Sequence, residues 1–111
     1  MKDKIKPLKI RELNDTFRRT FAGGRVVVTQ GIGSLSGELN EKVLAAVRNF
    51  NNFHKANDPH HEHDFGSFNV AGKLFCWKID YYDLAMSQHS VDPANAEATI
   101  RVLTIMCADE Y

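Results

Sequence analysis

The stretch FGSFNVAGKLFCWKIDYY, residues 65–82, decides the fold. Two runs rich in aromatic and apolar residues flank Ala71-Gly72, a pair suited to a tight hairpin turn. Side chains alternate between the two faces of a strand, so one face of the second run is more apolar than the other. The apolar set, which we expect to face the core, is Phe75, Trp77, Ile79 and Tyr81. The stretch therefore predicts an antiparallel strand pair with one buried face.

Two amphipathic helices are predicted on the amino-terminal side of this hairpin. Apolar residues recur at helical spacing from Leu8 to Phe21 and again after Ser36, which can cap a helix. Between these helices, the run from Arg25 to Gln30 is β-branched and almost continuously apolar, as in a central strand. The positions that set the two helical patterns are Ile10, Leu13, Phe17, Phe21, Leu39, Val43, Ala46, Val47 and Phe50.

One more helix is predicted after the hairpin. Asp92-Pro93 and Asn95 offer residues that start helices. The apolar residues from Ile100 to Cys107 would surround most of a helical cylinder, which is typical of a helix buried against a sheet. The order helix, strand, helix, strand, strand, helix predicts a compact two-layer α+β domain with a small, mostly antiparallel sheet. We expect this single domain over residues 10–111, after a basic extension at residues 1–9.

The composition excludes several classes of protein. The 111 residues carry 14 Lys and Arg against 14 Asp and Glu, so nothing requires a polyanionic partner. The charge is uneven, however, since residues 1–25 hold eight cations and three anions, and such a split can steer a charged partner. No apolar run approaches the ~20 residues of a spanning helix. We therefore expect a cytoplasmic protein without membrane association, in which Cys76 and Cys107 are buried and reduced.

The segment from Asp58 to Asp64 has the highest density of metal-binding residue types. It contains three imidazoles and three carboxylates in seven positions, and zinc accepts both kinds of ligand. The spacing matches neither an HExxH helix nor a CxxC turn. One interpretation is a functional metal site completed by Asp80 or Asp83. The favoured interpretation is a hydrogen-bonded loop with incidental histidines.

The end of the second hairpin strand carries another group of polar side chains. They are Lys78, Asp80, Tyr81, Tyr82 and Asp83. Counting positions from the Ala71-Gly72 turn places His63 and Asp64 beside residues 78–80 of the neighbouring strand. These groups would then open onto one surface and supply acids and bases. The favoured interpretation is instead a buried polar network of His63, Asp64 and tyrosine hydroxyls that fixes the loop.

No catalytic residue and no cofactor is predicted. Gly31-Ile32-Gly33 joins a strand to a helix, but it lacks the third glycine of a dinucleotide site and the lysine of a phosphate-binding loop. Neither cysteine and no serine stands in the context of an activated nucleophile. The sequence thus favours binding over catalysis.

Five short strings carry a resemblance to a known family. They are NDP at 57–59, EHDFG at 62–66, WKIDYYD at 77–83, IRELND at 10–15 and RVLTIM at 101–106. Together they resemble a family of uncharacterised small proteobacterial proteins, over nearly the whole chain from about Ile10. The resemblance implies a domain of unknown function, often encoded on plasmids or other mobile elements, with no assigned catalytic residues. His60-His61 depart from the family pattern, which weakens the metal interpretation.

The favoured hypothesis is a small non-enzymatic protein-interaction module. It would occupy a basic site on a protein partner through an acidic aromatic patch, and the resemblance implies a mobile-element accessory protein or an inhibitor of a host defence system. The expected binding residues are Glu62, His63, Asp64, Lys78, Asp80, Tyr82 and Asp83. One alternative is a metal-assisted hydrolase or nuclease that uses His63, Asp64, Asp80 and Asp83. A further alternative, disfavoured by net neutrality, is nucleic-acid binding through Lys9, Arg11, Arg18 and Arg19.

Overall fold

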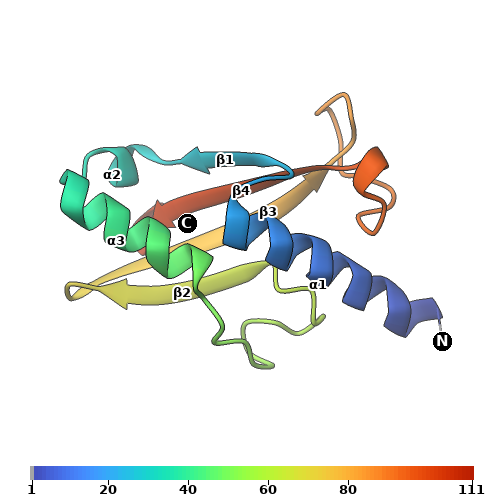
Figure 1. Cartoon of the computed structure of the whole chain (residues 1–111), viewed down its shortest axis with the longest axis horizontal. Coiled ribbons are helices and arrows are strands. Elements are labelled where there is room, and N and C mark those ends of the chain that lie inside the picture. The colour runs from blue at the N-terminus through green and yellow to red at the C-terminus, as the bar shows by residue number, and fades with distance from the viewer. Residues whose placement is uncertain (1) are drawn as a thin grey trace.

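The structure is a computed structural model that describes residues 2–111, with side chains from Ile5 onward (Figure 1). Its elements are α1 (Lys2–Thr20), β1 (Arg25–Val28), α2 (Gln30–Gly33), α3 (Gly37–Arg48), β2 (Phe65–Val70), β3 (Lys73–Tyr82), η1 (Ala96–Ala98), β4 (Ile100–Cys107) and η2 (Ala108–Glu110). Both predicted amphipathic helices and both hairpin strands are thus confirmed. α1 begins before the predicted Leu8, so the basic segment 1–9 is helical from Lys2 onward.

The four strands form one mixed sheet in the order β1-β4-β3-β2. β2 and β3 are antiparallel and joined by a two-residue turn, since Val70 pairs with Lys73. Ala71 and Gly72 both have positive φ, 54° and 82°, as a type I′ turn requires. β3 and β4 are also antiparallel, whereas β1 runs parallel to β4. β1 lies at the edge of the sheet, so the expectation of a central strand at Arg25–Gln30 is wrong. The predicted α+β class with a mostly antiparallel sheet is confirmed.

The last predicted helix is wrong, because residues 100–107 form the strand β4. β4 lies between β1 and β3 and is therefore central in the sheet. All of its side chains are buried or half-buried. A strand covered in this way is apolar at nearly every position, as a buried helix is, so the apolar pattern alone fits both elements. The β-branched residues Val102 and Thr104 are the local signal that favours the strand.

α1 and α3 lie on the same face of the sheet (Figure 1). Their buried side chains join those of β3 and β4 in one core, whose fully buried members include Phe17, Val43, Val47, Phe75, Trp77, Leu103 and Ile105. The predicted inward face of β3 is confirmed, since all four of its apolar residues are buried. Each large apolar side chain buried in this way contributes about 1.5–3 kcal/mol. The hairpin and the two helices therefore stabilise one another.

The opposite face of the sheet, called the open face, is covered by neither long helix (Figure 1). Directly paired positions of neighbouring strands share a face, so the pairing identifies its side chains. They are Arg25, Val27, Phe65, Ser67, Asn69, Leu74, Cys76, Lys78, Asp80, Tyr82, Ile100, Val102, Thr104 and Met106. Tyr111 covers part of this face, because its ring packs on Phe65 with 5.6 Å between centroids. Val27 and Leu74 remain 45% and 52% exposed.

Among residues 2–111, no helix has the length and apolarity needed to cross a bilayer. Cys76 and Cys107 are buried free thiols, as predicted. Burial raises the pKa of both thiols. Neither cysteine is therefore activated as a thiolate nucleophile.

Candidate functional site

The predicted alignment of the loop with β3 is correct in the backbone. Phe65 pairs with Lys78 at the start of β2. One position earlier, the carbonyl oxygen of Asp64 accepts a hydrogen bond from the amide of Ile79 at 2.9 Å. The end of the loop therefore lies beside the strand that carries the other predicted residues.

The side chains of the predicted patch nevertheless divide between the two faces of the sheet. Glu62 and His63 contact residues of α1 and of the inward face of β3, whereas Lys78, Asp80 and Tyr82 belong to the open face. The expectation that all of them share one surface is wrong. His63 has a φ of 54°, and this left-handed conformation just before β2 breaks the alternation on which the expectation depended.

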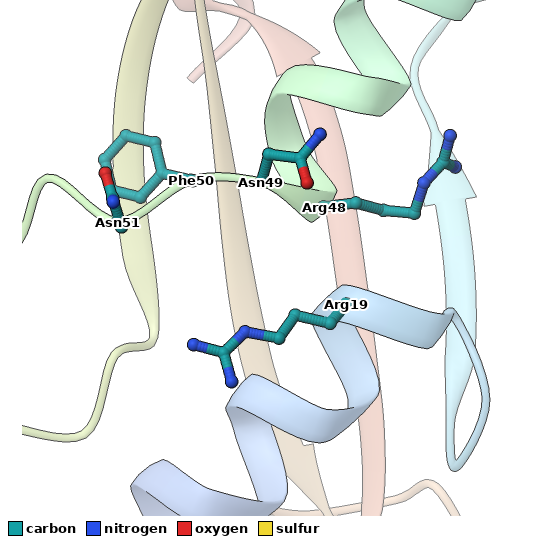
Figure 2. Close-up of a pocket in the computed structure, with 5 residues that line it drawn as sticks. All are labelled: Arg19, Arg48, Asn49, Phe50 and Asn51. Carbon is teal, nitrogen blue, oxygen red and sulfur yellow. The ribbon is translucent and has the colours of Figure 1, made fainter.

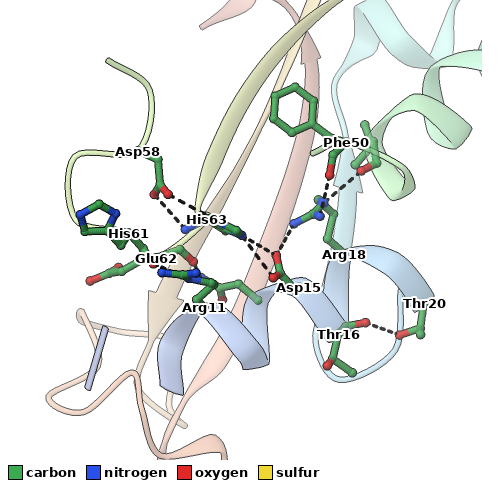
Figure 3. A network of polar contacts seen from close by, with 12 residues as sticks. Arg11, Asp15, Thr16, Arg18, Thr20, Phe50, Asp58, His61, Glu62 and His63 are labelled. Carbon is green, nitrogen blue, oxygen red and sulfur yellow. Dashed lines mark hydrogen bonds and ion pairs between the residues drawn. The ribbon is translucent and has the colours of Figure 1, made fainter. Parts of the chain in front are cut away.

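His63 lies between two carboxylates (Figure 3). Its Nδ1 is 3.0 Å from Oδ1 of Asp15, and its Nε2 is 3.5 Å from Oδ2 of Asp58. The imidazole also stacks on the ring of Phe53, with 3.7 Å between centroids and an interplanar angle of 4°. Both ring nitrogens thus face carboxylates of the chain itself. This arrangement suits a residue that holds the loop against α1 better than a metal ligand or a general base.

Tyr81 joins this loop to the core through a second polar cluster. Its hydroxyl donates to Oε1 of Glu62 at 2.9 Å and accepts from Nδ2 of Asn14 at 2.8 Å. Asn14 is fully buried and accepts from Nε of Arg101 at 2.8 Å. Burial raises the pKa of the Tyr81 hydroxyl, so it stays a neutral donor. The cluster links α1, the loop, β3 and β4, as the buried-network alternative expected for a tyrosine hydroxyl.

Asp64 is the carboxylate of the predicted patch with the fewest hydrogen-bond and ion-pair partners. Its side chain is half-buried and accepts no side-chain hydrogen bond from the described residues. Burial raises the pKa of this carboxyl, and the neighbouring charges of Glu62 and Asp58 raise it further. The buried-network alternative therefore holds for His63 and not for Asp64.

Lys78 and Asp80 form an ion pair on the open face, with 2.8 Å between Nζ and Oδ2. The hydrogen bond to Asp80 raises the pKa of Lys78. The half-buried Tyr82 lies beyond them on the same face of β3. Asp83 follows the strand and binds the next turn instead, since its Oδ1 accepts from the amide of Ser87 at 3.0 Å. This backbone hydrogen bond lowers the pKa of the Asp83 carboxyl.

Among the described residues, the four side chains of the metal-assisted alternative do not come together as a group that could hold a metal ion. A different group of ligand types does lie close together in the described chain, namely Cys107, Asp109 and Glu110. Glu110, however, accepts hydrogen bonds from the hydroxyl of Thr29 at 2.6 Å and from the amide of Gly31 at 3.0 Å. The hydrogen bond from Thr29 is the main cause that lowers the pKa of Glu110 to about 2. Through these hydrogen bonds, Glu110 binds the carboxyl-terminal segment to the residues that follow β1.

Arg18 is fully buried, so its expected role as a surface cation that contacts nucleic acid is wrong. Its Nε donates to the carbonyl oxygen of Val47 at 3.1 Å, its Nη2 to that of Phe50 at 2.9 Å and its Nη1 to Asp15 at 2.9 Å (Figure 3). The sequence does hold a signal for this role. Arg18 stands eight positions after Ile10, on the apolar stripe of α1.

The other cations of the nucleic-acid alternative differ in whether they are free to contact a nucleic acid. Arg11 donates its Nε to the carbonyl oxygen of His61 at 3.0 Å. Lys9 and Arg19 are exposed on α1. Two exposed cations supply little of the charge by which proteins follow a nucleic-acid backbone, so the geometry favours this alternative less than the sequence did.

Comparison with known protein families gives a match. The family model described as "Protein of unknown function (DUF3768)" matches residues 28–110. No curated protein and no solved structure matches the chain. α1 precedes the matched segment, yet its Asp15 and Arg18 bind the loop and the end of α3 inside that segment. Because the match covers most of the chain, this protein belongs to the DUF3768 family of proteins of unknown function.

Proposed function

We propose that the chain is a small protein-binding module without a catalytic role and that the open face is its binding surface. The observation that carries the proposal is the one-sided covering of the sheet. α1 and α3 bury the inward face, while half-exposed apolar side chains such as Val27 and Leu74 lie on the opposite one. Exposed apolar side chains beside polar groups are typical of an interaction surface. Lys78, Asp80 and Tyr82 of the predicted patch lie on this face.

The proposed partner is a protein with an apolar surface that carries a basic group. Val27 and Val102 would supply apolar contact, and Tyr82 is the type of aromatic anchor that interfaces favour. A cation of the partner would approach Asp80, which is 38% exposed beside Lys78. Association should then slow as the salt concentration rises. The proposed setting, a mobile-element accessory protein or an inhibitor of host defence, rests on the sequence resemblance.

The test compares partner capture by matched variants of the full chain. Val27→Lys and Tyr82→Ala alter the open face, whereas Leu84→Lys places the same cation at a residue that is 63% exposed and outside the sheet. We expect a protein captured from the native host to be lost with the first two variants and retained with the third. Retention by all three, with unchanged melting temperatures, would refute the open face as the binding surface.

A second copy of the chain is the competing occupant of the open face. Light scattering of the purified chain over a range of concentrations measures it directly. A dimer that Val27→Lys dissociates and Leu84→Lys preserves would assign the face to a second copy and contradict the proposed partner chemistry. A monomer at every concentration, together with the capture pattern above, supports the proposal.

A further inference from the structure

β1 forms one edge of the sheet (Figure 1). Within the described chain it pairs with β4 on its inner side, and no strand pairs with its outer side. Val27 and Val28 are 45% and 44% exposed, although their side chains point to opposite faces of the sheet. β1 contains no proline, and its one charged residue is Arg25. An apolar edge with few such protective residues pairs readily with a strand from another chain.

The backbone groups on the outer side of β1 belong to Val26 and Val28. In a parallel ladder, alternate residues direct both their N–H and their C=O groups to the same neighbouring strand. The amide of Thr29 donates to the carbonyl oxygen of Ile105 in β4 at 3.1 Å, so Val27, two positions earlier, also faces β4. Val26 and Val28 then face away from β4, and among the described residues neither has a hydrogen-bond partner on that side. The edge therefore offers two amide donors and two carbonyl acceptors.

The cations beside this edge have no acidic partner. Arg25 begins β1 and is exposed, with its side chain on the open face. Figure 2 shows the guanidinium of Arg48 directed toward the side of the sheet where β1 lies, and it is 5.0 Å from the ring centroid of Phe21. Among the described residues, neither arginine forms an ion pair. Glu110, beyond the other end of β1, already binds the hydroxyl of Thr29. The start of the edge is therefore complementary to an acidic residue.

We propose that the outer edge of β1 binds an extended segment of the protein partner, which adds a strand to the sheet antiparallel to β1. Main-chain hydrogen bonds give such strand addition its affinity, and side chains give it its specificity. An antiparallel segment would pair with both backbone groups of Val26 and of Val28. An apolar residue of the segment would lie opposite Val27 on the open face, and an acidic residue would lie opposite Arg25. The inference rests on the proposed protein-binding function and assigns the conformation and charge of the bound segment.

Titration of the isotope-labelled full chain with the end-blocked peptide TTVTE, followed by amide chemical shifts, tests the proposal. In the antiparallel alignment, the valine of this peptide lies opposite Val27 and its glutamate opposite Arg25. We expect the outward amides of Val26 and Val28 to shift most, and the amides of Val27 and Thr29, which face β4, to shift little. The peptide TTVTK should bind about threefold more weakly than TTVTE. Arg25→Glu should invert this preference.

Val28→Pro should weaken the binding of TTVTE about tenfold, because proline removes one outward amide and its ring occupies the edge. The hydrogen bonds to β4 remain, since the backbone of Val28 faces away from that strand. Val91→Pro is the matched control, because this valine is 98% exposed and lies outside the sheet. Equal weakening by the two prolines, or an unchanged peptide preference in Arg25→Glu, would overturn the proposal.

Capture of the host protein separates the edge from the open face. Loss of capture with Tyr82→Ala but not with Val28→Pro, together with no peptide-induced shift at Val26 or Val28, would refute the edge and keep the open face. Peptide binding at the edge, with capture lost in Val28→Pro and unchanged in Val27→Lys and Tyr82→Ala, would keep the edge and refute the open face. Shifts at Val26 and Val28 that depend on chain concentration without peptide would assign the edge to a second copy and overturn the proposed partner.

Discussion

The fully buried Arg18 of α1 donates from Nε to the carbonyl oxygen of Val47 in the last turn of α3, at 3.1 Å. Its other nitrogens bind the carbonyl oxygen of Phe50 and the carboxylate of Asp15. One guanidinium therefore closes the end of α3 and fixes the start of the loop that follows. A helix end in the interior needs such donors, because its last carbonyl groups lack partners within the helix.

Replacing Arg18 should strongly destabilise the fold. Arg18→Gln leaves two carbonyl groups and the half-buried carboxylate of Asp15 without the guanidinium that binds them, which costs about 3–5 kcal/mol. Arg19→Gln, at the adjacent exposed position, should change the free energy of unfolding by less than about 0.5 kcal/mol. Urea denaturation of both variants measures the difference. Similar stability of the two would show that the buried contacts contribute little.

Gly66 should tolerate no side chain. It pairs with Trp77 across the strands, and a Cβ there would lie 2.6 Å from Nε1 of Trp77 and 2.7 Å from the ring of Phe50. Gly66→Ala should therefore cost about 1–3 kcal/mol through overpacking. Gly37→Ala is the control, because its Cβ meets no atom within 4 Å at the start of α3. It should leave stability unchanged or raise it, and an equal loss at both glycines would contradict the steric explanation.

Glu110 should make the fold sensitive to acid. Its pKa falls from an ordinary value of 4.5 to about 2 because it accepts hydrogen bonds from Thr29 and two backbone amides. A lowered pKa of this kind contributes stability above pH 4.5 that is lost as the pH falls toward 2. The melting temperatures of wild type and Glu110→Gln should thus converge over this interval. A difference that stays constant from pH 7 to pH 2 would show that the carboxylate charge is not the cause.

Asp64→Asn should raise the melting temperature at neutral pH by a few degrees. The pKa of Asp64 is raised by burial and by neighbouring carboxylates, so its ionised form opposes folding at neutral pH and the cost disappears on acidification. The advantage of the variant should therefore shrink as the pH is lowered. Asp80→Asn is the matched control, since it removes a carboxylate already paired with Lys78 on the surface. That change should produce no gain and a loss of at most about 1 kcal/mol.

Ala71→Asn should stabilise the hairpin. Ala71 has a φ of 54° in the type I′ turn, a conformation that costs an ordinary residue about 1–2 kcal/mol and that asparagine accepts more readily. We expect a gain of about 1 kcal/mol in thermal or chemical unfolding. A loss of stability would mean that the side chain of residue 71 makes a contact that asparagine cannot make.

The sequence by itself determined the elements whose pattern is local. Ala71-Gly72 between two aromatic runs specified the hairpin and its register, because a two-residue turn leaves one pairing in which the alternating apolar side chains share a face. Helical spacing specified α1 and α3 for a similar reason, since each helix buries one stripe. From these elements the α+β class followed.

Only the tertiary structure decided where β4 belongs and which side chains meet. An apolar run of eight residues fits either a central strand or a buried helix. Residues 100–107 form a strand because they pair with β1 on one side and with β3 on the other. The left-handed φ of His63 turned that side chain toward Asp15 and away from Asp80. Arg18 stands on the apolar stripe of α1, but only the position of the end of α3 gives its guanidinium the carbonyl partners. Such contacts join residues far apart in the chain, and their energy depends on burial that no local pattern records.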